Sequence, residues 1–207
     1  MTVSEINTHA RRKYNAIGSS FFSDAEIYDF IYEGCLEMVN NGLNVERLFS
    51  TSTVVGQLQY SFPTNVIAIK RVVYNGAKLS PINMREDDLV TASNENVTTQ
   101  GTPKYYFTWN ETLNLRPIPD AVNDLEIYAF VEPQPITSAS ALEIPSQWHM
   151  SLVDFVVSEM CAKDKNLSQA AYYLSKWERA VQKALAHQAK KRHKDEFAMV
   201  QHDEFIE

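Results

Sequence analysis

Several features that define common classes of protein are missing from this sequence. It has two cysteines, Cys35 and Cys161, and neither has a second Cys or a His at the spacing of metal ligands. No apolar run approaches the roughly 18 residues of a membrane span, and the first residues lack the apolar core of a secretory signal. We therefore expect a soluble protein made in the cytosol, with no membrane contact and two buried thiols without a chemical role.

Motifs of catalysis and cofactor binding are also absent. The chain has only six glycines, and none of them forms a phosphate loop, a dinucleotide-binding motif or a nucleophile elbow. Five histidines lack metal-ligand spacing, namely His9, His149, His187, His193 and His202. We expect no enzyme and no cofactor. One alternative stays open, a hydrolase that uses a carboxylate pair drawn from Glu111, Asp120, Glu126 and Glu132.

An excess of positive charge is missing as well. The formal net charge is −7, whereas nucleic-acid binders are usually basic. The one basic run, Lys190 to Lys194, is followed by Asp195 and Glu196. We interpret this run as a solvated helix end, because the end of a helix attracts cations through its dipole. Contact with phosphate is the alternative.

Helical patterns occupy both ends of the chain. Thr2 or Ser4 can cap a first helix, and the sequence from Ser23 to Glu26 is a capping box that predicts the start of a second. Apolar residues then recur at helical spacing as far as Met38. Two further helices are predicted in residues 138–191, where apolar stripes follow Pro145 and Ser168.

Between the helices, apolar and polar residues alternate with the period of a β-strand. Asn75-Gly76 and Asn110-Glu111 mark two tight hairpin turns. About five or six short antiparallel strands are predicted, separated by a polar loop at residues 84–101. The predicted fold class is α+β, a helical bundle from the N- and C-terminal helices with an inserted antiparallel β lobe and an extended C-terminal tail. Its parts are residues 1–46, 47–137, 138–191 and 192–207.

One hairpin collects four aromatic residues within five positions, Tyr105, Tyr106, Phe107 and Trp109. On a strand, Tyr105, Phe107 and Trp109 share one face and Tyr106 lies on the other with Thr108. One of the two faces is expected to fill a core. We predict that Tyr105, Tyr106 and Trp109 form an interface with another subunit of an oligomer, because Tyr and Trp anchor such contacts. A glycan or single-stranded nucleic acid stacked on these rings is the alternative, although only Lys104 and Arg116 would supply positive charge.

The last sixteen residues lack helical periodicity but contain five large apolar side chains. A merely solvating segment would avoid such side chains. Two interpretations stay open: the segment orders against a neighbouring protein, or it packs back on its own helix. The five residues are Phe197, Met199, Val200, Phe205 and Ile206.

Four stretches of the sequence resemble head-to-tail adaptor proteins of tailed bacteriophages, the group that includes tail tubular protein A and the tail accessory factors. They are FFSDAEIYDFIYEGCLEMV, YSFPTNVIAIKRVVYNGAKLSPINMRE, GTPKYYFTWNETLNLRPIPD and IPSQWHMSLVDFVVSEMCAKDKN. Together they span most of residues 20–185. They are signatures of a fold and contain no catalytic residue.

The resemblance implies a structural virion protein at the junction of head and tail. Its expected partners are further copies of itself in a ring of twelve, the portal protein above and a tail or nozzle protein below. Genomic DNA would pass through the ring without specific binding. In such adaptors the C-terminal extension commonly reaches the portal, which assigns Phe197, Met199, Val200, Phe205 and Ile206 to that contact.

Overall fold

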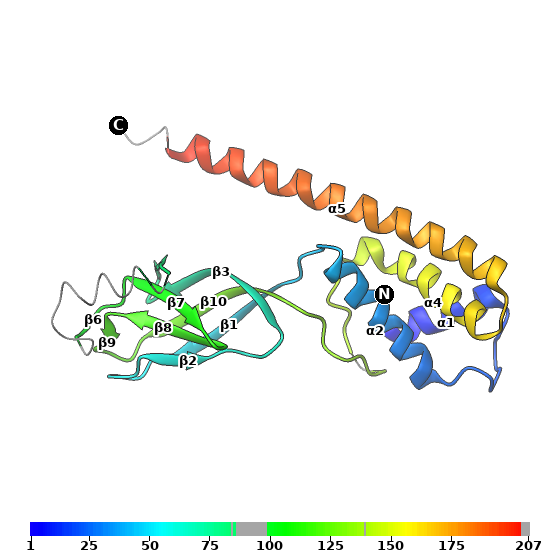
Figure 1. Cartoon of the computed structure of the whole chain (residues 1–207), viewed down its shortest axis with the longest axis horizontal. Helices are drawn as coiled ribbons and strands as arrows, with labels where there is room; N and C mark the ends of the chain where they lie inside the picture. Colours follow the sequence, from blue (N-terminus) through cyan, green and yellow to red (C-terminus); the bar gives the residue numbers. More distant parts are fainter. Residues whose placement is uncertain (84, 86–98, 139, 204–207) are drawn as a thin grey trace. The chain divides into compact units, whose positions relative to one another are not determined.

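The computed structural model describes residues 1–83, 85, 99–138 and 140–203, with residues 191–203 described by their backbone alone. The chain divides into two compact units (Figure 1). The helical unit comprises Met1–Val45 and Pro133–Glu207, and the β unit comprises Glu46–Glu132. The middle of the sequence thus forms a unit of its own, while its two ends build the other together.

The helical unit is organised around one central helix. Helix α4 contacts α1, α2 and α5, so that it packs with helices from both ends of the sequence. Its core consists of apolar side chains that recur at helical spacing, including Ile6, Ile31, Leu152, Met160 and Trp177, all fully buried. The helices are α1 (Val3–Tyr14), α2 (Asp24–Asn40), the short 3-10 helix η1 (Ser146–Trp148), α4 (His149–Lys163) and α5 (Leu167–Asp203).

Both predicted N-terminal caps are present. Thr2 Oγ1 accepts from the Glu5 N–H at 3.2 Å, and Glu5 Oε2 accepts from the Thr2 N–H at 2.8 Å, which completes a capping box. Ser23 Oγ accepts from the Glu26 N–H at 3.2 Å. The Glu26 carboxylate instead accepts from the Lys163 ammonium at 2.6 Å, so the second box is only half formed. A tertiary ion pair between α2 and α4 therefore replaces the local contact.

The β unit contains two four-stranded sheets and a third sheet of two strands. The first sheet has the order β1–β10–β3–β4, with β1 (Glu46–Ser52), β10 (Asp124–Val131), β3 (Val66–Tyr74) and β4 (Ala77–Lys78). The second has the order β2–β8–β7–β5, with β2 (Gln59–Ser61), β8 (Thr112–Arg116), β7 (Tyr105–Trp109) and β5 (Ser80–Pro81). The third pairs β6 (Gln100–Gly101) with β9 (Ile118–Pro119).

The two larger sheets share one hydrophobic core. Strand β10 alternates as predicted, with Leu125, Ile127 and Ala129 buried and the residues between them half-exposed. These side chains cluster with Leu113 and Leu115 of the second sheet. The alternation of apolar residues along the strands is thus explained by sheet-on-sheet packing.

Both predicted hairpin turns are present. Asn75 and Gly76 have φ angles of 48° and 76°, and Asn110 and Glu111 have φ angles of 48° and 59°. Positive φ at both central residues gives the turn a twist that matches the twist of the flanking strands. Glu111 adopts this left-handed conformation without the freedom of glycine.

The structure overturns the predicted fold class, because the described residues are not a helical bundle with a small β insertion and an extended tail. The β unit holds ten strands in three sheets, and β5–β7 and β6–β9 pair in parallel. Three of the four strands in these pairs, β5, β6 and β9, are two residues long and therefore too short to show an alternating pattern. The predicted tail is helical as far as Asp203. Its Lys, Gln, Ala and Glu residues favour helix, and no Gly or Pro interrupts it.

Replacing Glu111 with glycine should stabilise the β unit. An L-residue in the left-handed region destabilises the folded state by about 1 to 3 kcal/mol, and glycine removes this strain. Glycine also raises the entropy of the unfolded chain, which cancels part of the gain in stability. We expect Glu111→Gly to raise the free energy of unfolding by about 1 kcal/mol, measured by urea denaturation of the whole chain. Glu111→Ala, which removes the carboxylate but keeps the strain, is the control and should give no such gain. Equal effects of the two substitutions would contradict this account of the turn.

Candidate interaction surfaces

The described residues hold little that suggests chemistry. Among them, no three His, Cys, Asp or Glu side chains come together as metal ligands, and no described helix has the length and hydrophobicity to cross a bilayer. Cys35 and Cys161 are buried and unpaired. Burial raises the pKa of the Cys35 thiol to about 12, which keeps it protonated at neutral pH.

The aromatic residues of β7 divide between the core and the surface. Tyr106 is buried and belongs to the core cluster with Leu113 and Leu115, so it does not face outward as an interface residue. Tyr105 and Trp109 lie on the outer face of the second sheet and are 36% and 59% exposed. The interface role of Tyr105 and Trp109 stays a prediction.

The residues beside this outer face argue against stacking of a single-stranded nucleic acid. Such sites combine aromatic rings with several cations that contact the phosphates. Arg116 is buried, with its guanidinium 5.6 Å from the centre of the Phe107 ring. Of the two cations that the sequence offered, only Lys104 is exposed.

A second exposed apolar surface, which the sequence did not reveal, consists of Val54, Val55 and Val122. We call it the tip patch. These side chains are 53%, 50% and 65% exposed and come from two loops. The loops are joined because the Thr53 N–H donates to Asn123 O at 2.8 Å and the Gly56 N–H donates to Pro119 O at 2.9 Å. Two valines before a glycine, in a segment where polar turn residues are expected, are the signal that points to this patch.

Buried polar groups hold the loops of the tip patch in place. Tyr60 Oη accepts from the Val54 N–H at 3.0 Å and lies 3.2 Å from the carbonyl oxygens of Val54 and Gln57. Thr53 Oγ1 accepts from the Asn123 N–H at 3.0 Å, and Asn123 Nδ2 donates to Tyr74 Oη at 2.8 Å. The valines are thus presented by an ordered loop, which lowers the entropy cost of covering them.

An apolar groove of about 420 Å³ lies between β3 and β7. Among the described residues, β4 covers the edge of β3 only near Val73 and Tyr74, and β5 covers β7 at Tyr105 and Tyr106. Open strand edges beside an apolar wall can accept an extended segment of another chain. The groove is lined by Phe62, Val66, Ile67, Ala68, Ile69, Pro81, Ile82, Tyr106, Phe107 and Thr108.

The residues predicted to contact the portal lie at or beyond the end of α5. The backbone of Phe197, Met199 and Val200 is helical, and Phe205 and Ile206 lie outside the described residues. Helix α5 has 37 residues and α4 has 15, so α5 continues past α4 (Figure 1). Near the end of the described side chains, Gln188 Oε1 of α5 accepts from the Asn44 N–H at 3.1 Å.

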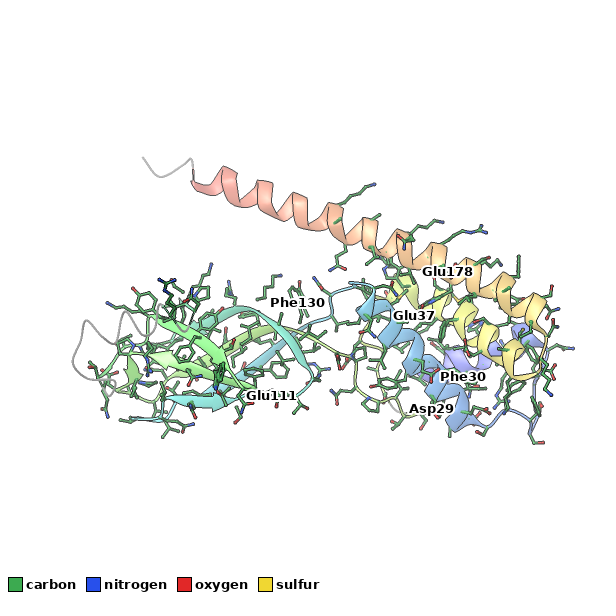
Figure 2. All side chains as sticks on the ribbon, in the orientation of Figure 1. Asp29, Phe30, Glu37, Glu111, Phe130 and Glu178 are labelled. Carbon is green, nitrogen blue, oxygen red and sulfur yellow. The ribbon has the colours of Figure 1, made fainter. Side chains whose placement is uncertain are left out.

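The carboxylates considered for a hydrolase lie on separate elements. Glu111 sits in the β7–β8 turn, as Figure 2 shows, and Asp120 follows β9. Glu126 on β10 accepts from the Tyr128 hydroxyl at 3.1 Å. The structure gives these groups no shared pocket in the described part of the chain.

Comparison with protein families gives one match. A family model described as SU10 adaptor protein matches residues 1–200. The match includes both units and nearly all of α5. A search of curated proteins found no match.

Tyr60→Phe tests whether the tyrosine hydroxyl orders the tip patch. The substitution removes the acceptor of the Val54 N–H, and we expect a loss of about 1 to 2 kcal/mol in stability together with faster hydrogen exchange at the Val54 amide. Tyr106→Phe is the matched control, since Tyr106 is also buried but its hydroxyl has no hydrogen bond in the described residues. Unchanged exchange at Val54 in Tyr60→Phe would show that other contacts order the loop.

Proposed function

Because the chain belongs to the SU10 adaptor protein family, we propose that it joins the head of a tailed bacteriophage to its tail. The observation that carries this proposal is the family match over residues 1–200. It confirms, at the level of the family, the resemblance to phage adaptors in four stretches of the sequence. The chain is therefore a structural adaptor of a phage, and we propose that it catalyses no reaction.

In the proposed assembly, copies of the chain form a ring below the portal, and twelve copies would match a twelve-fold portal. A ring subunit needs two different faces that meet the next copy on each side. The helical unit and the β unit both expose large apolar side chains, including Phe21, Tyr172, Trp109 and Val122. This surplus supports contacts on several faces of the subunit.

The two units are proposed to serve different partners. The end of α5 reaches the portal, where Phe197, Met199 and Val200 are presented on a helix. The β unit meets the phage tail or nozzle protein through the tip patch and the outer face with Tyr105 and Trp109. Genomic DNA passes through the ring without specific binding, which the net charge of −7 supports, because tight binding of DNA requires many cationic contacts to phosphate.

A glycan-binding module remains the second candidate. The observation in its favour is the pair of exposed rings, Tyr105 and Trp109, on one outer face. Aromatic rings stack on sugars as readily as they anchor protein interfaces. The family match favours the adaptor.

Removing residues 192–207 should separate folding from docking. The α4–α5 packing and the Asn44–Gln188 contact lie before the cut, so we expect the truncated chain to keep its unfolding midpoint and to lose only the helical circular dichroism of residues 192–203. Binding to the portal protein of the same phage should fall at least tenfold for the truncated chain. Binding is measured by co-sedimentation of the purified proteins, and particle size by light scattering.

The matched control carries Val54→Ser, Val55→Ser and Val122→Ser. It should bind the portal like the unmodified chain and should bind the tail protein of the same phage less tightly. Portal binding that survives the truncation would refute the role of the C-terminal segment. An unmodified chain that binds neither portal nor tail protein would refute the adaptor proposal.

A further inference from the structure

Helix α2 presents a stripe of negative charge away from its own core. It carries Asp24, Glu26, Asp29, Glu33 and Glu37 and no basic residue. Three of these groups have partners within the helical unit: Asp24 pairs with Arg11, Glu26 with Lys163, and Glu37 accepts from the Trp177 indole N–H at 3.0 Å. Asp29 and Glu33 are exposed, lie one turn apart and make no ion pair within the described residues.

Glu159 of α4 adds a further negative charge beside α2. Burial raises the pKa of its carboxyl, and the nearby charges of Glu33 and Glu37 raise it further. The ionised form is therefore less stable in the folded chain than in water. This cost is present at neutral pH and disappears as the pH falls through the raised pKa. A cation brought to this side of the unit would relieve it.

Helix α5 carries the opposite charge on its outward face. Lys176, Arg179, Lys183 and Lys190 follow one another at spacings of three, four and seven residues, which places them on one side of the helix. The buried residues Trp177, Val181 and Ala184 lie on the other side. The one acidic residue from Leu167 to Lys190 is Glu178.

The basic stripe is available for an outside partner. Arg179, Lys183 and Lys190 are exposed and make no ion pair in the described part of the chain. Lys176 lies over the ring of Tyr172, with its Nζ 4.8 Å from the ring centre, and Tyr172 itself is 56% exposed. An exposed tyrosine beside cations is typical of the composition of interfaces.

The two stripes belong to different helices of one unit. Figure 2 shows Glu37 of α2 and Glu178 of α5 near one another, and both line the groove between these helices together with Arg179 and Lys183. Asp29 lies on the side of α2 away from α5. A two-fold symmetric pair would require α2 of each copy to meet α5 of the other at the same time. In the ring proposed above, α2 of one copy meets α5 of the next, and repeating this heterologous contact closes a ring if the rotation allows.

We propose that the acidic stripe of α2 (Asp29 and Glu33) packs against the basic stripe of α5 (Arg179 and Lys183) of a second copy of this chain. The inference rests on the proposed ring and names the surface through which its subunits meet. The complementary charges favour contacts of α2 with α5 over contacts of α2 with α2 or of α5 with α5. Tyr172 supplies apolar area at the same contact.

Charge reversal tests the pairing of α2 with α5. The variants are compared with the unmodified chain either alone or with the portal protein, whichever condition lets the unmodified chain assemble. Asp29→Lys with Glu33→Lys gives a chain with two basic stripes, and Arg179→Glu with Lys183→Glu gives a chain with two acidic stripes. Each should lose assembly at least tenfold when alone. An equimolar mixture of the two should assemble again, because every contact in an alternating ring then joins opposite charges. Native mass spectrometry gives the copy number, which should be even in the mixture.

Two further chains complete the experiment. The chain with all four substitutions should assemble by itself. Glu111→Lys with Glu132→Lys, on exposed positions of the β unit, changes the net charge by as much as Asp29→Lys with Glu33→Lys and should assemble like the unmodified chain. Circular dichroism checks that each variant is folded.

The outcomes distinguish the inference from the proposed function. If the reversed chains assemble normally, or if their mixture stays monomeric, the pairing of α2 with α5 is wrong while the ring stands. If the unmodified chain forms no oligomer either alone or with the portal protein, the proposed ring is wrong and the pairing falls with it.

Discussion

The antiparallel pairing of β1 with β10 is the constraint on which the rest of the structure depends. Glu46, the first residue of the β unit, pairs with Phe130, close to the last residue of that unit. The chain therefore leaves the helical unit and returns to it at neighbouring points. Because of this closure, α1 and α2 can pack on α4 although about a hundred residues separate them in sequence. The described strands of the β unit pair only with one another, and the chain divides into two compact units.

Both units leave large apolar side chains exposed. Val54, Val55 and Val122 are held outward by buried hydrogen bonds of Thr53 and Tyr60. Satisfying these polar groups inside the loops fixes the loop conformation, and the valines cannot turn inward to fill a void. In an isolated chain such exposure favours association. In an adaptor of the SU10 family, surfaces of this kind suit contacts that form only during assembly.

In the helical unit, exposed charged side chains add to the exposed apolar area that is available for contacts with another chain. The cations of α5 and the carboxylates of α2 lie on different helices that both pack on α4, and Arg179 and Lys183 share a groove with Glu37 of α2. Exposed charges contribute little to the stability of a single chain. Their complementarity instead favours one partner and one orientation over others. The half-buried Glu159 extends the same negative surface toward the core.

The sequence by itself determined the features that depend on a few neighbouring residues. These include the caps at Thr2 and Ser23, the turns at Asn75-Gly76 and Asn110-Glu111, and the alternation along β10, because each follows from local backbone preferences. Tertiary structure decided what each side chain faces. It turned Tyr106 into the core, buried Arg116 beside Phe107 and paired Glu26 with Lys163. It also formed the tip patch and the parallel pairs that involve the two-residue strands β5, β6 and β9. These features join segments distant in sequence and therefore leave no periodic pattern. Whether a side chain is buried depends on which distant segment the topology packs against it, and no local sequence pattern specifies that segment.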